Sequence, residues 1–317
     1  MQKITQWFPL LGQLANYSKD KWVSDVIAAV VVTVMLIPQS LAYAILAGLP
    51  PHYGLYASII PIVVYSLLGS STSLAVGPVA IASIMTASAL SSVVSAGLTT
   101  YVDGAITLAF LSGAMLFLLG IFRFGFVANF LSHSVISGFI TASGLIIAVG
   151  QLKHLMGVSV SGHTFFELAG ALIQSISGIN AATVALGASC LLFLVIARQY
   201  AARWLSMLGL SKNMASTVAR LSPIVAVCVS TAVVAVWSLD QLGVAIVGDI
   251  PAGIADPKVP AITREAVEAL LLPAFFIAII GYVESISVGR TLGAKKGEKV
   301  DSNQELIALG GANLASA

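Results

Sequence analysis

Long apolar runs, separated by short polar segments, dominate this chain. No Asp, Glu, Lys or Arg occurs between Asp25 and Asp103. Further uncharged runs cover residues 104–122, 124–152, 168–197 and 221–239. A helix that crosses the hydrocarbon core of a bilayer needs about 20 mainly apolar residues, so each run can hold at least one such helix. The pattern predicts an all-α integral membrane protein that crosses the bilayer several times.

We predict spanning helices in these runs and place their limits at polar or turn residues. The first covers residues 26–43 and is broken by Pro38, and the second covers residues 54–69. Later spans cover residues 104–122, 134–151, 182–198, 221–239 and 269–289. Segment 164–177 is apolar but short, and the run 306–317 is too short to cross the bilayer as written.

The stretch after the second span has a different pattern. Residues 70–73 are polar, residues 74–76 are apolar, and Gly77-Pro78 precedes a helix-compatible run to about Leu90. Proline is favoured at the first position of a helix, and glycine permits a tight approach to it. We predict an extended segment that leads into a half-helix starting inside the membrane. A backbone broken at that depth is tolerated only where it is buried in protein or lines a cavity.

Composition agrees with a membrane protein and argues against several other classes. Hydrophobic residues make up 58% of the chain and charged residues only 9%, whereas soluble domains have about 25% charged residues. No basic cluster indicates a nucleic-acid partner, and neither a nucleophile with its base nor a metal-ligand spacing indicates an enzyme. Cys190 and Cys228 lie in apolar runs and are interpreted as packing residues. No cofactor is expected apart from a coupling Na⁺ or H⁺.

The distribution of Lys and Arg predicts the orientation. With the N terminus in the cytoplasm, twelve of the 15 Lys and Arg residues lie on the cytoplasmic side, and Lys153, Lys258 and Arg264 lie outside. Cytoplasmic loops of membrane proteins carry such an excess of positive residues. We expect a cytoplasmic N-terminal segment over residues 1–25 and a multi-pass domain over residues 26–317, located in the plasma membrane (the inner membrane of a bacterium).

Glu284 is the one acid in the predicted span 269–289. A charged side chain at the bilayer centre costs on the order of 3 kcal/mol, and such residues usually face the bundle interior on a pathway for ions or protons. The alternative is that Glu284 lies near a helix end and pairs with Arg290. We interpret Glu284 as a functional residue.

Gln39 lies in the middle of the first predicted span, and Tyr43 lies one helical turn further along on the same face. The Gln39 amide donates hydrogen bonds without carrying a full charge, which suits a bound anion. The alternative is that Gln39 links neighbouring helices by a hydrogen bond, as polar residues often do in membranes.

The predicted half-helix supplies a third candidate element of an anion site. A helix N terminus presents free N–H groups and a partial positive charge, so it can bind an anion without Lys or Arg. Val79 and Ala80 would supply the N–H groups, and Gly77 would permit a close approach. The alternative is a simple kink at Gly77-Pro78.

The first and last full spans resemble each other and run in opposite directions in this topology. Gln39 is followed after nine residues by Gly48, and Glu284 is followed after nine residues by Gly293. This similarity indicates an inverted repeat. Transporters built in this way bind substrate and coupling ion near the midplane, at discontinuous helices.

Two motifs resemble the SulP family of sulfate permeases. One covers residues 36–58 and begins LIPQSLAYA, and the other is NQELIALG at residues 303–310. The resemblance extends over essentially the whole chain. It implies the uracil permease-like fold, a seven-plus-seven inverted repeat whose third and tenth elements are half-helices. It also implies a core that carries the anion, a gate that supports the core and a homodimer, and elevator-type alternating access.

The resemblance further implies which residues face the substrate. Gln39 matches the polar position of the first span, and Gly77-Pro78 matches the start of the third. Glu284, Ser285 and Ser287 match the site-facing part of the eighth span. An acid at the Glu284 position resembles bacterial members of the family that couple transport to protons or sodium.

The chain ends at Ala317, within the part that corresponds to the ninth span of the family. We therefore expect an incomplete membrane domain, comprising the first repeat and the start of the second, without the second half-helix or the cytoplasmic STAS domain.

The predicted function is secondary active transport of a small anion of the sulfate, bicarbonate or dicarboxylate type. Gln39, Tyr43, Gly77, Val79, Ala80, Ser285 and Ser287 would bind the anion. Glu284 would take up the coupling cation. One alternative is a nucleobase–cation symporter of the same fold. The others are a membrane enzyme, which would need clustered His, Asp or Cys at membrane depth, and a non-transporting membrane scaffold.

Overall fold

The computed structural model describes residues 8–14, 17–129, 133–160, 165–248, 253 and 263–317. These residues form helices and connecting segments, with no strand among them, as predicted. The chain folds into two compact units. The first comprises residues 1–21, 39–140 and 250–317, and the second comprises residues 22–38 and 141–249. Lys258, which the sequence places on the outer side, lies outside the described residues.

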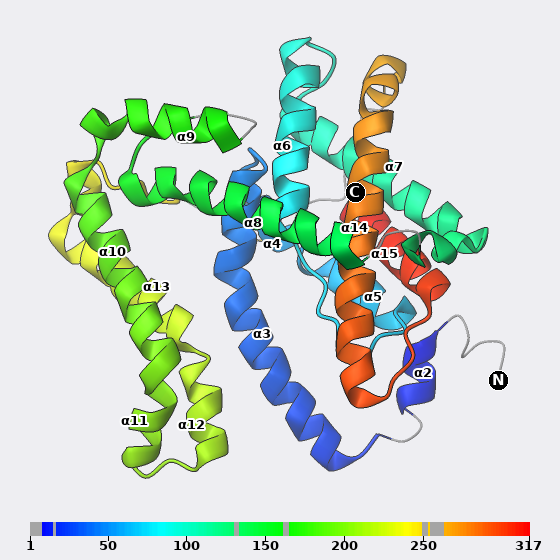
Figure 1. Ribbon diagram of the computed structural model, residues 1–317, viewed down its shortest axis with the longest axis horizontal. Helices are drawn as coiled ribbons and strands as arrows, with labels where there is room; N and C mark the ends of the chain where they lie inside the picture. The colour runs from blue at the N-terminus through cyan, green and yellow to red at the C-terminus, as the bar shows by residue number, and fades with distance from the viewer. Residues whose placement is uncertain (1–7, 15–16, 130–132, 161–164, 249–252, 254–262) are drawn as a thin grey trace. The chain divides into compact units, whose positions relative to one another are not determined.

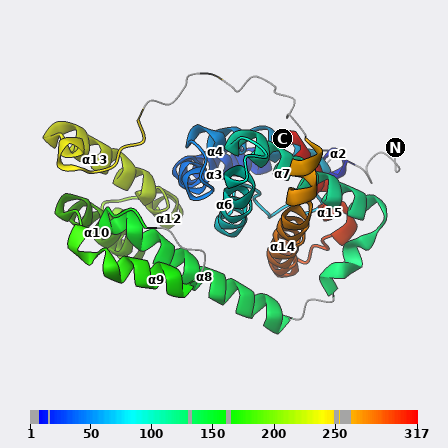
Figure 2. The same cartoon turned by 90° about the horizontal axis from the view of Figure 1, so that it is seen from above.

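Helices α3 (Lys19–Leu46) and α8 (His133–Met156) each contribute residues to both units. The first unit otherwise contains α2 (Pro9–Leu14), α4 (His52–Tyr56), α5 (Ile60–Leu68), α6 (Ala80–Ser95), α7 (Tyr101–Ile121), η1 (Phe124–Asn129), α14 (Arg264–Lys296) and α15 (Ser302–Ser316). The second contains α9 (Phe165–Gln174), η2 (Ile176–Gly178), α10 (Ala181–Ile196), η3 (Ala197–Ala201), α11 (Ala202–Met207), α12 (Lys212–Ala219), α13 (Ser222–Trp237) and η4 (Leu239–Leu242). In the second unit α10 packs beside α13 (Figure 2).

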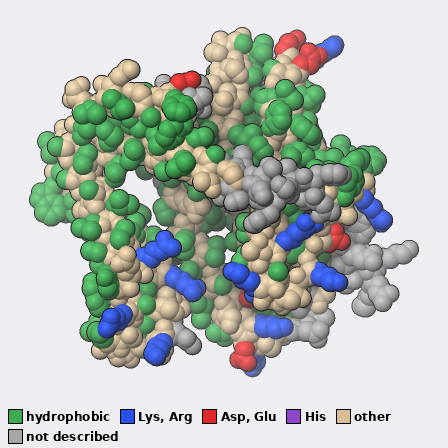
Figure 3. Space-filling model, viewed as in Figure 1, with side chains coloured by type: hydrophobic (Ala, Val, Ile, Leu, Met, Phe, Trp, Pro, Cys, Tyr) green, Lys and Arg blue, Asp and Glu red, His purple; other side chains and the backbone are tan. Residues whose placement is uncertain are grey.

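Among the described residues, 4 helices are long and apolar enough to cross a membrane. They are α3, α7, α14 and the continuous helix Ala181–Met207, which joins α10 to α11 through the single π turn η3. Large apolar side chains lie on the surface of both units (Figure 3), such as Leu192, 61% exposed, and Leu272, 63% exposed. Since surfaces of this kind suit lipid rather than water, the prediction of several membrane spans is confirmed by length and composition.

One face of α14 is the centre of the first unit. Buried positions recur along it at every fourth residue, so they form a single ridge: Ala266, Leu270, Ala274, Ala278, Tyr282 and Ile286. This ridge packs against α6 and α7 (Figure 1), and Tyr282 and Ile286 join a core cluster with Leu306 and Leu309 of α15. The helix is longer than the predicted span 269–289, because its N-cap Thr263 and the left-handed Gly297 set its ends.

Helices α7 and α15 approach closely because glycines line their contact. A Cβ at Gly113 would lie 2.7 Å from the backbone nitrogen of Leu314, and one at Gly120 would lie 2.6 Å from Ile307 Cγ1. A Cβ at Gly310 would lie 2.8 Å from the Cα of Phe117. Small residues allow membrane helices to pack backbone against backbone, where van der Waals contact replaces the hydrophobic effect.

Two of the predicted spans differ from the structure at prolines. Helix α3 continues through Pro38, so the predicted break is wrong; the ring removes a hydrogen bond to Val34, but the helix does not end there. The span predicted over residues 54–69 is instead two helices, α4 and α5, separated at residues 57–59. Pro61 lies in the first turn of α5, where proline favours a helix start.

The predicted extended segment and the short helix after it are confirmed. Residues 69–79 contain no helix, and Gly69 and Val79 have extended backbone angles. Helix α6 begins at Ala80 with Val79 as its N-cap, so the predicted start at Pro78 is wrong by two residues. The helix runs to Ser95, beyond the predicted limit near Leu90.

We expect Gly310→Ala to destabilise the protein, because its Cβ would meet the backbone of α7, which cannot rotate away as a side chain can. Overpacking of this kind costs about 1–3 kcal/mol. The measurement is thermal unfolding in detergent. Gly281→Ala is the matched control, because no atom lies within 4 Å of a Cβ there and the gain in helix propensity is the same. Equal melting temperatures for the two variants would contradict the close packing of α7 and α15.

Candidate functional site

A cavity of about 400 Å³ lies within the first unit, and all the residues that line it belong to that unit. Its walls come from α3 to α7, the extended segment, α14 and α15. The polar side chains that line it are Tyr43, Tyr53, Ser83, Thr86, Glu284, Ser285, Asn313 and Ser316. No Lys, Arg or His is among the described lining residues. Any anion held here would therefore depend on hydroxyls, amides and backbone N–H groups.

The N terminus of α6 meets this cavity through Gly77, Pro78 and Val79, which all line it. No side chain caps this helix. The first bond of the helix runs from the N–H of Ser83 to the carbonyl of Val79 at 3.0 Å, so the N–H groups before Ser83 have no partner within the helix. These groups carry the partial positive charge of the helix dipole. Ala80, the first helical residue, is buried and is not among the lining residues.

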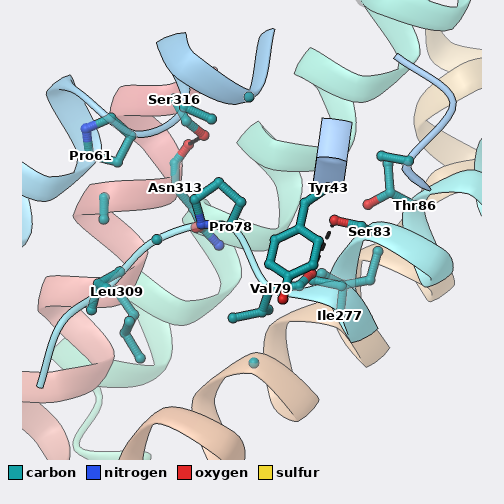
Figure 4. Close-up of a pocket in the computed structure, with 18 of the residues that line it drawn as sticks. Tyr43, Pro61, Pro78, Val79, Ser83, Thr86, Ile277, Leu309, Asn313 and Ser316 are labelled. Atoms are coloured by element: carbon teal, nitrogen blue, oxygen red, sulfur yellow. Dashed lines mark hydrogen bonds between the residues drawn. The ribbon is translucent and has the colours of Figure 1, made fainter. Parts of the chain in front are cut away.

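Tyr43 lines the cavity, whereas Gln39 does not. The side chain of Gln39 is exposed, and its Nε2 donates a hydrogen bond to the Tyr43 hydroxyl at 3.3 Å. In Figure 4 the Tyr43 ring, Val79 and Ser83 lie toward one another. Gln39 therefore acts on this site indirectly, by holding the Tyr43 hydroxyl. That hydroxyl accepts the hydrogen bond from Gln39 and can still donate its own proton to a ligand.

Helix α14 contributes Glu284 and Ser285 to the lining, and Ser287 is not among the lining residues. Glu284 forms no hydrogen bond or ion pair with any residue that the structure describes. The alternative pairing with Arg290 is not formed, and Arg290 instead donates to Ser302 Oγ at 2.6 Å. Glu284 is thus a half-buried carboxylate with no partner in the part of the chain that the structure describes, and in a membrane-spanning helix its charge is costly.

Several lining residues were not identified from the sequence. Ser83 and Thr86 lie at i and i+3 on α6, which places them on one face of the helix. Since the half-helix was predicted to line a cavity, this spacing could have identified Ser83 and Thr86 from the sequence. Asn313 and Ser316 come from α15 (Figure 4), and Tyr53 comes from α4. No local pattern distinguishes these three from ordinary polar positions.

Comparison with known proteins finds sulfate transporters and a prestin among the relatives of this chain. The chain is 37% identical over 310 residues to a probable sulfate transporter of Mycobacterium tuberculosis, covering 98% of this chain and 52% of that protein. It is 32% identical over 335 residues to prestin of Danio rerio, covering 98% of this chain and 44% of that protein. The chain thus spans about half the length of the curated relatives it matches.

Solved structures agree in fold. The murine Slc26a9 anion transporter matches with a TM-score of 0.86 and 28% identity over 99% of this chain and 53% of that chain. The transmembrane domain of the cyanobacterial bicarbonate transporter BicA matches with a TM-score of 0.77 and 20% identity, over 95% of this chain and 73% of that chain. Both have the seven-plus-seven inverted-repeat fold, so the predicted fold class is confirmed.

The sulfate transporters among these relatives agree with a transport protein and not with the membrane-enzyme alternative. The model of the sulfate permease family matches residues 22–317, which include the extended segment, α6 and Glu284. On this match and the 37% identity with the mycobacterial protein, the chain belongs to the sulfate permease family.

Proposed function

We propose that the protein is a secondary active transporter of a small inorganic or carboxylate anion, of the sulfate, bicarbonate or dicarboxylate type. The observation that carries this proposal is the uncapped N terminus of α6 at a cavity whose described lining includes hydroxyls and an amide but no cationic side chain. Such a site stabilises the negative charge of an anion with dipoles and not with a full positive charge. The anion can therefore leave as well as bind, as transport requires.

Glu284 is proposed as the coupling residue. It lines the same cavity as the α6 N terminus and has no protein partner among the described residues, so it is available to a proton or a Na⁺ ion. Uptake of the cation would remove the net charge of the carboxylate and lower its cost in an apolar wall. The cation would also offset repulsion between Glu284 and the anion, which links the binding of the two.

We propose elevator-type alternating access, in which the first unit carries the anion. The cavity supports this because its lining comes from that unit alone, so a movement of the unit would carry an intact site with it. A homodimer, a cytoplasmic segment over residues 1–25 and a membrane domain from residue 26 in the plasma membrane complete the proposal. The bias of Lys and Arg supports this orientation, and basic side chains gather at the α11–α12 end of the second unit (Figure 3).

We expect Glu284→Gln in the full-length protein to uncouple transport. Accumulation of labelled sulfate, bicarbonate or a dicarboxylate in liposomes, driven by an imposed proton or Na⁺ gradient, should fall by roughly 5- to 150-fold, the usual range of coupling between two ligands. Exchange of internal for external anion without a gradient should persist, because the α6 N terminus is unchanged.

Glu268→Gln is the matched control, since Glu268 lies on the same helix but is exposed and bonded to Arg264 at 2.8 Å. Gradient-driven uptake that is unchanged in Glu284→Gln would contradict the coupling role. Uptake of uracil or xanthine without any anion would favour the nucleobase alternative, and the absence of all transport would favour a scaffold.

We expect Tyr43→Phe to weaken anion binding while the maximal rate stays close to that of the wild type. Loss of one hydrogen bond of about 0.5–1.5 kcal/mol corresponds to an apparent KM about 2- to 10-fold higher. The measurement is the concentration dependence of anion uptake. Tyr200→Phe is the control, because Tyr200 is exposed in the second unit and stacks on Trp204. An unchanged KM in Tyr43→Phe would exclude this hydroxyl from the site.

A further inference from the structure

Glu305 is a fully buried acid of the first unit, and the proposed function gives it no role. It lies near the start of α15, is 0% exposed and does not line the cavity. A buried carboxylate is costly unless it is hydrogen-bonded or paired. We therefore expect the residues around Glu305 to supply hydrogen bonds that stabilise its carboxylate.

Four hydrogen bonds converge on the Glu305 carboxylate. Oε2 accepts one from the Tyr65 hydroxyl at 2.7 Å. Oε1 accepts three, from the N–H of Ser70 at 2.8 Å, the hydroxyl of Ser70 at 2.7 Å and the N–H of Ser71 at 3.0 Å. An ionised carboxylate donates nothing and has about four acceptor sites. The four donors therefore match what this side chain can accept.

The start of α15 holds the same stretch of chain at further points. Gln304 Nε2 donates to the carbonyl of Leu68, the last residue of α5, at 2.6 Å. The N–H of Asp301, the N-cap of α15, donates to Ser70 Oγ at 3.0 Å. Helices α5 and α15 lie side by side (Figure 1), so these bonds fix the point where α5 ends and the extended segment begins.

The segment fixed in this way leads directly to the proposed anion site. Residues 69–79 have no helix or sheet to hold them. Leu74 and Val76, in the middle of the segment, pack against the cluster that contains Tyr65 and Tyr282. Beyond them, Gly77 to Val79 line the cavity and Val79 starts α6. The direction in which the α6 N terminus points therefore depends on where the segment is anchored at Ser70 and Ser71.

We propose that Glu305 is a positioning residue for the anion site. By holding Ser70 and Ser71 it places Val79 and the first N–H groups of α6 against the cavity, although it touches neither the cavity nor the anion. This inference rests on the proposed function, because it assumes that the α6 N terminus binds the anion. Its role differs from that of Glu284, which has no protein partner among the described residues and is proposed to bind the cation.

The test compares Glu305→Ala with wild type in the full-length protein by two measurements. In sulfate uptake by liposomes, the apparent KM should rise about tenfold, equivalent to about 1.4 kcal/mol of binding free energy, while the maximal rate stays near that of wild type. In hydrogen exchange, the amides of residues 69–79 should exchange faster, and those of α7 should not change. Glu298→Ala is the matched control, since this exposed acid accepts only the Thr72 hydroxyl from the same segment and should leave both measurements unchanged.

Glu305→Gln keeps the proposal testable where the alanine variant fails to fold. The amide oxygen can still face Ser70 and Ser71, and the amide NH₂ can donate to Tyr65, whose hydroxyl can accept. This variant should fold, with a smaller rise in KM and faster exchange in residues 69–79. If the alanine variant does not fold, a wild-type KM and wild-type exchange rates in Glu305→Gln would overturn the proposal.

A lower melting temperature and maximal rate in Glu305→Ala, with an unchanged KM, would also overturn it, because a purely structural role predicts that result. A wild-type protein that moves no anion would instead overturn the proposed function. The exchange measurement would then still support or exclude the anchoring of residues 69–79 by Glu305, since it does not depend on transport.

Discussion

A polypeptide inside a membrane cannot leave its backbone polar groups without hydrogen bonds, and this constraint bears most heavily on residues 69–79. A helix satisfies its own N–H and C=O groups, but an extended segment has to find partners elsewhere. At the start of this segment the partners come from another helix, since Glu305 accepts the N–H groups of Ser70 and Ser71, and Gln304 donates to Leu68. Further along, the N–H groups of Ser73 and Leu74 donate to Ser71 Oγ within the segment. Helix α15 therefore satisfies the backbone where the interruption before α6 begins.

That arrangement requires α15 to lie very close to its neighbours. Glycines on both helices let α15 approach α7, and Gly311 of α15 lies close to Leu68 of α5. Larger side chains at these positions would push α15 outward, and a carboxylate at position 305 would then no longer reach Ser70. The close packing of α7 and α15 and the broken backbone before α6 therefore depend on each other. Van der Waals contact sets the distance of α15 from its neighbours, and the hydrogen bonds of Glu305 form only at that distance.

Features that depend on local pattern could be predicted from the sequence, and features that depend on distant partners could not. The apolar runs predicted α7, α10, α13 and α14, and Gly77-Pro78 predicted the extended segment before α6. Pro38 and Pro61 both lie within predicted apolar spans. Helix α3 nevertheless continues through Pro38, whereas Pro61 lies in the first turn of α5. The sequence singled out Gln39, but the structure places its amide on Tyr43, because one turn of helix separates the two side chains.

Glu284 and Glu305 show most clearly which features of the site the sequence alone does not reveal. Glu284 stands out in the sequence because it interrupts an apolar run. Glu305 follows Asp301 near a helix start, where acids are common because they interact favourably with the helix dipole. In the structure Glu305 is the more deeply buried of the two and accepts four hydrogen bonds, all from residues 234 to 240 positions away along the chain. Glu284 has none among the described residues. A carboxylate whose acceptor sites are filled by protein groups can hold a backbone in place but cannot take up a cation without releasing it. A carboxylate without protein partners can bind and release a cation while the surrounding helices stay fixed, so the number of donors around each acid separates the proposed anchor from the proposed coupling site.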